Sequence, residues 1–301
     1  MTEGETGGHP ITGRKWVRSS QRNLSRRLGG QISHHTVGRL LRKLGFSPRV
    51  NRKRFTGPPH PDRDRQFRQI QRQKKAFERT GDPRISVDTK KKELIGNFKN
   101  AGRRWCRKAD EVNAHDFPQD ATCRAVPYAI YDEQHNEGHV RVGTSGDTAA
   151  FAVAAIRGWW RTRGRRRFPK AKRLLITADA GGSNSCRSRL WKRELQRWAD
   201  QDGLEITVCH YPTGASKWNA VEHRLLNHIS ANWAGYPLRT LEAMLAFLRG
   251  TTTQTGLSVT AQLDQRPYPL RIKVPDDEMA GLHIRHQRIC PSWNYTFKPR
   301  K

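Results

Sequence analysis

The sequence predicts an α/β fold, namely an RNase H-like mixed sheet flanked by helices and preceded by a small all-α helix-turn-helix region. Two observations predict this order. Residues 84–144 hold alternating apolar and polar segments separated by turn residues, which indicates strands joined by hairpins. Residues 147–233 then switch repeatedly between helical and strand-like patterns, which indicates parallel crossovers. Other α+β arrangements of the same elements stay open at this point.

The composition is that of a strongly basic protein with a real core. The 301 residues include 57 Lys and Arg against 27 Asp and Glu, a formal charge of +30, and 35% hydrophobic residues. Such a charge attracts polyanions, so nucleic acid is the expected partner, as it also is for ribosome-associated and structural RNA-binding proteins. No apolar run approaches the roughly 20 residues of a membrane span, and no signal peptide is visible, so we expect no membrane partner and a cytoplasmic location. The five cysteines lack CxxC spacing, which favours reduced thiols.

The N-terminal quarter carries about half of the excess charge, with 20 Lys and Arg against five Asp and Glu in residues 1–80. Residues 1–15 are predicted to be a disordered start. Residues 16–56 show two helical patterns broken by a pair of glycines, with Ser33 placed to cap the second helix and Gly45 to end it. Residues 57–80 are predicted to form a Pro-rich linker and a basic helix.

Two short helices joined by a Gly-containing turn are typical of a helix-turn-helix, whose second helix enters a DNA groove. The alternative is a helical hairpin with a solvated basic face. The side chains expected to contact DNA are His34, His35, Thr36, Arg39, Arg42 and Lys43 of the second helix, and Arg52, Lys53 and Arg54 of the basic arm that follows.

The main domain is predicted over residues 81–250. We expect strands at 84–89, 93–99, 125–132 and 139–144, a helix at 147–163 capped by Asp147, a buried strand at 173–179, a helix at 188–203, a strand at 204–211 and a helix at 218–233. Residues 251–301 have mixed composition and are predicted to be a C-terminal tail of unassigned role.

Three acidic residues occupy informative places in this order. Asp88 lies in the first strand, Asp179 ends the buried strand, and Glu222 lies one turn into the last helix. In an RNase H-like sheet these places converge at one edge. Three gathered carboxylates repel one another unless they hold cations, and hard oxygen ligands suit Mg²⁺ or Mn²⁺. Each residue also has a simpler interpretation, because strand-ending aspartates often cap helices and helical glutamates often face water.

Two such ions, about 3.5–4 Å apart, could activate a water or a 3′-hydroxyl for in-line attack on a phosphodiester. Asp88 would bridge the ions, and Asp179 and Glu222 would each hold one. Gly181 and Gly182 would let the backbone approach the scissile phosphate, and Asn219 shares the helical face of Glu222.

Further basic side chains near these positions are expected to contact nucleic acid. The run 161–173 reads either as a solvated charge run or as a track for the DNA backbone, and we favour the track. The histidines His210, His223 and His228 form no HxxxH pair, so contacts with phosphate or with the residues that hold a metal are expected rather than zinc. The nucleic-acid contacts predicted in this domain are Lys90, Lys91, Lys92, Arg165, Arg166, Arg167, Lys217 and Asn219.

Several long segments closely resemble the DDE-domain transposases of bacterial insertion sequences of the Rhodopirellula type. The segments are SVDTKKKELIGNFKNAGR (86–103), LLITADAGGSN (174–184), LWKRELQ (190–196), ITVCHYPTGASKWNAVEHRL (206–225) and WNYTF (293–297), together with ISHHTVGRLLRKLGFS (32–47) and HPDRDRQF (60–67). In this resemblance Asp88, Asp179 and Glu222 match the DDE triad.

The resemblance implies cleavage at the ends of a transposable element and transfer of the freed 3′-hydroxyls to target DNA, with Mg²⁺ as cofactor. It also implies terminal-repeat and target DNA as partners, a dimer or larger assembly on DNA, and a bacterial, nucleoid-associated location. Members of the family usually have a longer N-terminal region, so this chain is expected to be a shortened copy. Two alternatives stay open: an RNase H-like nuclease that uses the same triad, and a non-catalytic DNA-binding relic.

Overall fold

The computed structural model describes residues 6–8, 15–17, 19–48, 60–114, 117–215 and 218–300. The chain divides into two compact units, residues 1–56 and 57–301. Each unit is built around its own secondary structure, and they are described separately.

The N-terminal unit contains two short helices, α1 (Gln21–Arg27) and α2 (His34–Lys43). The hydroxyl of Ser33 accepts a hydrogen bond from the backbone N–H of Thr36, 3.2 Å away, which caps α2 as its position predicts. Gly45 follows the helix with a φ of 81°, a conformation that a glycine adopts without strain. Leu24 and Val37 are the buried apolar side chains of the two helices.

A two-stranded antiparallel sheet joins β1 (Thr6–Gly8) and β2 (Lys15–Val17) in the same unit. Residues 6–8, which the sequence predicts to be disordered, instead form a strand, because their backbone pairs with that of residues 15–17. Glycine-rich composition alone cannot show such a pairing, since the partner strand lies outside the segment.

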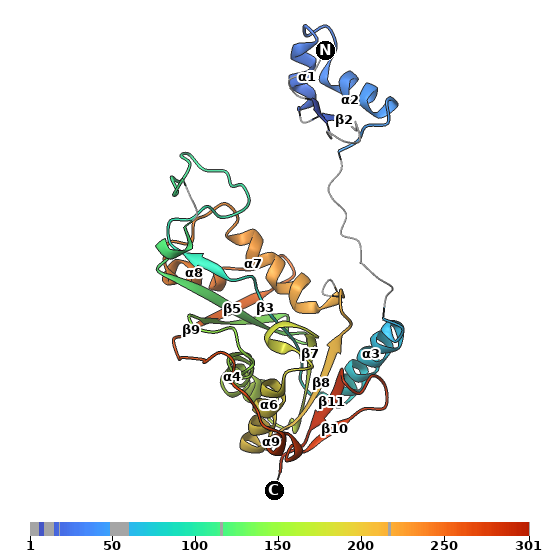
Figure 1. Cartoon of the computed structure of the whole chain (residues 1–301), viewed down its shortest axis with the longest axis vertical. Helices are drawn as coiled ribbons and strands as arrows, with labels where there is room; N and C mark the ends of the chain where they lie inside the picture. The colour runs from blue at the N-terminus through green and yellow to red at the C-terminus, as the bar shows by residue number, and fades with distance from the viewer. Residues whose placement is uncertain are drawn as a thin grey trace. The chain divides into compact units, whose positions relative to one another are not determined.

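The second unit is built on a nine-stranded sheet within the described residues (Figure 1). Its strands are β3 (Arg84–Thr89), β4 (Glu93–Ile95), β5 (Cys123–Asp132), β6 (Glu137–Gly143), β7 (Arg173–Asp179), β8 (Glu205–Tyr211), β9 (Ser258–Asp264), β10 (Ile284–His286) and β11 (Asn294–Phe297). Their order across the sheet is β10-β11-β8-β7-β3-β5-β6-β9, with β4 paired to β5. Strands β3, β7 and β8 run parallel, whereas β5 is antiparallel to both β3 and β6.

This topology is the predicted RNase H-like fold, with its hairpin strands first and its parallel crossovers after. The predicted RNase H-like mixed sheet is therefore confirmed, whereas the helix-turn-helix assignment stays a prediction, and the N-terminal unit is not all-α because it also holds β1 and β2. The predicted 251–301 tail does not match the structure, because β9 extends the sheet beside β6 and β11 extends it beside β8. Isolated short strands with mixed composition gave no sign of these partners, which lie far away in the sequence.

Helices cover both faces of the sheet, with α4, α6 and α9 on one side and α7 and α8 on the other (Figure 1). Their bounds are α4 (Ala149–Trp159), α6 (Arg189–Asp202), α7 (Asn227–Asn232), α8 (Leu241–Arg249) and α9 (Asp276–Ala280). The first layer buries Trp191 and Trp198 of α6 against Ile85 and Val87 of β3. The second buries Leu225 and Ile229 against strands β5, β6 and β9. Alternation along each strand thus sends every second side chain to each layer.

The basic helix α3 (Arg63–Thr80) packs on the face that α7 and α8 also cover. Ile70 and Phe77 contact Leu175 of β7 together with Cys209 and Tyr211 of β8. Helix α3 ends at Gly81, whose φ of 70° is left-handed.

Two helices differ from their predicted form. Helix α4 is capped by Thr148, whose hydroxyl accepts from the N–H of Phe151 at 3.2 Å, and not by Asp147. It continues as a π-helical turn, η3 (Trp160–Gly164), into α5 (Arg165–Arg167). The helix predicted at 218–233 contains a π-helical turn, η6 (Glu222–Leu226), before α7. Such turns occur frequently at functional sites.

Candidate active site

Asp88 and Asp179 lie side by side at the carboxyl ends of two neighbouring parallel strands. Strands β3 and β7 pair up to Val87 and Ala178, so the two aspartates are the next residues in register. Both point to the sheet face opposite Val87 and Ala178, which pack in the α4 and α6 layer. Glu222, the first residue of η6, approaches from the helix on that same face and shares a hydrogen bond with Asp88. The structure therefore brings together the three acidic residues that the sequence singled out.

The environment of Asp88 and Asp179 favours the protonated forms of their two carboxyl groups. Burial, the charge of Asp179 and the hydrogen bond and charge of Glu222 raise the pKa of Asp88 to about 8, against the opposing effect of the Thr89 N–H. Burial and the charge of Glu222 raise the pKa of Asp179 to about 6, although Asn219 donates to its carboxylate. No ion pair joins any of the three acids to a basic side chain within the described residues. The cluster thus carries uncompensated negative charge when ionised.

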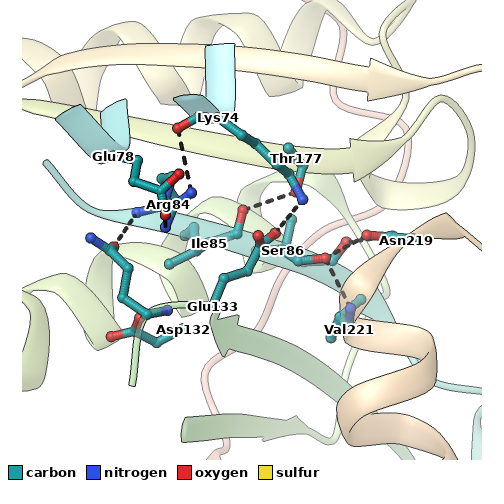
Figure 2. A network of polar contacts seen from close by, with 12 residues as sticks. Lys74, Glu78, Arg84, Ile85, Ser86, Asp132, Glu133, Thr177, Asn219 and Val221 are labelled. Atoms are coloured by element: carbon teal, nitrogen blue, oxygen red, sulfur yellow. Dashed lines mark hydrogen bonds and ion pairs between the residues drawn. The ribbon is translucent and has the colours of Figure 1, made fainter. Parts of the chain in front are cut away.

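A buried serine ties the start of the Glu222 helix to strand β3 (Figure 2). The Ser86 hydroxyl accepts from the backbone N–H of Val221 at 3.0 Å and donates to the Asn219 side-chain oxygen. The Asn219 amide in turn donates to the Asp179 carboxylate at 3.3 Å. Both Ser86 and Asn219 are fully buried. One connected set of neutral groups therefore fixes the acid-bearing helix beside both aspartates.

A second neutral chain reaches Asp179 through its backbone. His210 of β8 has one ring nitrogen 3.0 Å from the Asp179 carbonyl and the other 2.6 Å from the Tyr295 hydroxyl. Burial lowers the pKa of His210 to about 4, so the ring is neutral and donates to the carbonyl while it accepts from Tyr295. The indole N–H of Trp191 donates to the same Tyr295 hydroxyl at 3.0 Å. The WNYTF segment thus holds the end of β7.

The two aspartates open into a groove of about 1430 Å³, which we call the acid groove. Its cationic lining includes Lys91, Lys92, Arg124 and Arg187. The Lys92 ammonium lies 3.7 Å from the Asp147 carboxylate, whereas the side chains of Lys91, Arg124 and Arg187 have no hydrogen-bond or ion-pair partner among the described residues. An acidic centre inside a basic groove is suited to a polyanion whose reacting group binds cations.

The loop after β7 forms one side of this groove. Gly181 and Gly182 are exposed, and a Cβ added at either would meet no atom within 4 Å. The loop is anchored where Tyr128 donates to Asn184 at 2.6 Å and where Thr89 and Ser183 share a hydrogen bond of 3.0 Å. Its open backbone is thus held firmly at the groove.

The predicted nucleic-acid contacts of this unit differ in their surroundings. Lys90 is buried, pairs with Glu93 at 2.6 Å and packs its ammonium over the Trp233 ring. Asn219 is fully buried and serves the acid cluster, so its amide faces the carboxylate of Asp179. Arg165, Arg166 and Arg167 are exposed beyond η3, and Arg167 pairs with Glu137. They are not among the residues that line the acid groove.

In the N-terminal unit, α2 exposes His35, Arg39, Arg42 and Lys43, with His34 and Thr36 partly exposed. The helix-turn-helix role of this unit stays a prediction. Arg52, Lys53, Arg54 and Lys217 lie outside the described residues.

Several residues of the site were not singled out from the sequence. From the sequence, Ser86 is only a strand residue and Tyr295 only part of the WNYTF segment, whereas His210 is expected to contact phosphate or a metal ligand, and the structure places it against the Asp179 carbonyl. A polar residue between buried aliphatic neighbours, as at Ser86 between Ile85 and Val87, is the one signal that could have found it, because a buried polar group needs a partner. Arg124 and Arg187 carry no motif and are brought to the groove by the fold alone.

No group of three or more His, Cys, Asp and Glu side chains in the described part of the chain is arranged as a ready-made metal site. No helix among the described residues is long and apolar enough to cross a membrane.

Comparisons with known proteins identify the family of this chain. The sequence profile of a family described as Rhodopirellula transposase DDE domain matches residues 1–299. No curated protein matches the chain. Among solved structures, the "Mos1 transposase paired-end complex with left transposon end" is 13% identical, with a TM-score of 0.45 over 76% of this chain and 65% of that one. The "Crystal structure of the Mos1 Strand Transfer Complex" is 13% identical, with a TM-score of 0.46 over 76% and 64%. The "Crystal structure of the Mos1 mariner paired end complex with Mn" is 14% identical, with a TM-score of 0.43 over 76% and 65%. The chain thus covers a little under two thirds of the length of these proteins.

Proposed function

Because the chain belongs to the Rhodopirellula transposase DDE-domain family, we propose that it cuts DNA at the ends of an insertion sequence and joins the freed 3′-hydroxyls to target DNA. The observation that carries this proposal is the convergence of Asp88, Asp179 and Glu222 at the carboxyl edge of the sheet, where the two aspartates line a groove that also holds basic side chains. Phosphodiester chemistry requires stabilisation of charge on the attacking and leaving oxygens, and this edge is where the chain concentrates its oxygen ligands.

The residues present fit divalent cations such as Mg²⁺ or Mn²⁺. The donors are carboxylate oxygens, which these hard ions prefer, and the raised pKa values of Asp88 and Asp179 show that the cluster lacks positive charge. Asp88 would contribute to both of two ions, with Asp179 and Glu222 each holding one. When bound, such ions would activate the attacking oxygen and stabilise the leaving one.

The remaining groups of the acid groove would bind and orient DNA. The side chains of Lys91, Arg124 and Arg187 have no hydrogen-bond or ion-pair partner among the described residues, so their charges are available to bind phosphates. Gly181 and Gly182 would allow the backbone of the DNA to approach the loop after Asp179 closely. The hydrogen bond between the His210 ring and the Asp179 carbonyl would fix the position of the start of that loop.

The partners of this reaction would be the element's terminal repeats and the target DNA. The basic face of α2 would recognise the repeats, in the manner of a helix-turn-helix. Because two DNA ends must be joined to one target, a dimer or larger assembly on DNA is part of the proposal.

The test is Mg²⁺-dependent nicking and strand transfer on a duplex that carries the element's own ends. Asp88→Asn, Asp179→Asn and Glu222→Gln should each abolish both products while DNA binding persists. Asp132→Asn is the matched control, because Asp132 is also a buried carboxylate of the sheet. Its backbone in β5 lies opposite that of Ile85, at the other end of β3 from Asp88. Retained nicking in the three site variants would refute the proposal. Nicks without strand transfer would identify a nuclease, and salt-sensitive binding without nicks would identify a DNA-binding relic.

A further inference from the structure

A second groove lies between α3 and the β10–β11 hairpin. It has a volume of about 660 Å³. Neutral amides of Gln69, Gln73 and Gln287 line it, and both α3 glutamines donate to the Gln287 side chain. Its basic lining residues are Arg65, Arg72, Arg173, Arg285, His286 and Arg288, and we call it the arginine groove.

Most of this positive charge is not neutralised within the chain. Arg72, Arg285 and Arg288 are exposed, and their side chains form no hydrogen bond or ion pair with any described residue. Glu205 is the one acidic residue on the lining. By contrast, Arg65 pairs with Asp62, and Arg173 pairs with Asp82. Three unpaired guanidinium groups around one groove repel one another, so the surface is expected to bind a polyanion.

The arginine groove adjoins the acid groove. Asp62 lines the acid groove and forms a 2.8 Å ion pair with Arg65, which lines the arginine groove. Along the hairpin, Ile289 lines the arginine groove and the next residue, Cys290, lines the acid groove. A chain of phosphates that crosses this boundary therefore passes from one groove directly into the other.

The boundary between the grooves is rigid. Gln66 of α3 and Asn294 of β11 exchange two hydrogen bonds, of 3.0 and 2.6 Å, and both side chains are fully buried. Asn294 also donates to the carbonyl of Ile289 at 2.8 Å, which fixes the hairpin turn. These hydrogen bonds hold helix α3 and the hairpin together, so the positions of the two grooves relative to each other are fixed.

From this continuity we propose that the arginine groove binds the phosphodiester backbone of the DNA that extends beyond the acid cluster. The proposal rests on the proposed function, because it takes the acid groove as the place of reaction. The exposed arginines stand around an open groove whose floor is neutral, which suits a row of phosphates. The side chains of the three unpaired arginines are exposed, and arginines of this kind contact the phosphate oxygens of DNA.

The test compares two triple variants of the full chain in DNA binding without divalent ions. Arg72→Gln, Arg285→Gln and Arg288→Gln remove the three unpaired charges of the groove. Lys170→Gln, Arg271→Gln and Lys273→Gln remove three charges from exposed residues that line neither groove and have no partner among the described residues. The probes are a short duplex that ends at the cleavage position and a duplex extended by about ten base pairs on each side.

The groove variant should lose affinity for the extended duplex, and its slope of log affinity against log salt should fall by roughly 2–3, since each phosphate contact contributes about 0.9. Between about 0.05 and about 0.2 M salt, its affinity should therefore change roughly 40-fold less than that of the wild type. Binding of the short duplex should stay close to wild type. Equal slopes for the wild type and both triple variants would overturn the proposal. Because no cleavage is involved, this result is independent of whether Asp88→Asn abolishes nicking.

Discussion

Replacing Ser86 with alanine should separate the positioning of Glu222 from the stability of the sheet. The Ser86 hydroxyl is the partner of two buried groups, the Val221 N–H and the Asn219 side-chain oxygen. The Ser86→Ala substitution would leave both groups without this partner. Each orphaned group costs about 1–3 kcal/mol, so the free energy of unfolding should fall by about 2–6 kcal/mol. The start of the Glu222 helix would also lose its tie to β3, and catalysis should fall further than stability explains.

The matched control is Thr207→Val. The Thr207 hydroxyl shares a buried hydrogen bond of 3.0 Å with Thr296, in the same sheet but between β8 and β11. Its loss orphans a single hydroxyl, so the expected cost is about 1–3 kcal/mol, and the acid cluster should be untouched.

The assay pairs urea unfolding, followed by tryptophan fluorescence, with Mg²⁺-dependent nicking under conditions where each variant is fully folded. Trp191 and Trp198 are buried in the core of the sheet unit, so the fluorescence reports its unfolding. Ser86→Ala should lose at least tenfold in nicking rate per folded molecule, whereas Thr207→Val should retain the wild-type rate; a tenfold loss is about 1.4 kcal/mol of transition-state stabilisation. Equal nicking rates for the two folded variants would refute the positioning role of Ser86.

Three further outcomes are expected. In the metal-free protein, the pKa of Asp88 is raised to about 8 and that of Asp179 to about 6, so the folded state holds protons that the unfolded chain releases near pH 4. This contribution to the free energy of unfolding is full below about pH 4 and is lost as the pH rises through about 8. Thermal melting from pH 4 to 9 should show this fall, and a fall of equal size in Asp88→Asn would contradict it. Tyr295→Phe should destabilise the sheet unit by about 1–3 kcal/mol for each of the two hydrogen-bonding groups it orphans, one of them on His210, and a urea midpoint equal to wild type would argue against the chain of contacts. Gly181→Ala should change stability by less than about 0.5 kcal/mol, because its φ of −119° suits alanine and open space surrounds it, yet it should weaken nicking if DNA approaches the loop; unchanged nicking would remove that role.

Much of the fold was predictable because its central strands carry their own pattern. The alternation in residues 84–89 and the aliphatic run at 174–178 each define a strand and its buried face. The edges of the sheet were not predictable. Strand β9 pairs in parallel with β6, more than a hundred residues earlier, and neither segment contains a turn or motif that announces the other. Long-range pairings of short strands depend on the whole sheet, which local pattern does not record.

The acidic residues of the site were predictable from their places in the order of elements, and the structure brings them into contact, while their catalytic roles stay proposals. The groups that hold them were not predictable. Asn219 was expected to contact nucleic acid, because an amide on the face of Glu222 has many possible partners, and only the fold shows that it is buried against Asp179. Asp147 was expected to cap a helix, but the neighbouring Thr148 caps it instead and leaves the Asp147 carboxylate on the lining of the acid groove.

The supports of the acid cluster share one chemical property, which is that they are neutral. Asp179 accepts from an asparagine amide, its carbonyl accepts from a neutral histidine, and a serine hydroxyl holds the helix of Glu222. Lys90, the residue that follows the end of β3, forms its ion pair with Glu93 instead. An ammonium or guanidinium group at any of these positions would hold the carboxylates equally firmly, but it would also compensate their charge and compete with a divalent cation. Neutral donors fix the geometry and leave the negative charge available, which agrees with the proposed binding of divalent cations by this cluster.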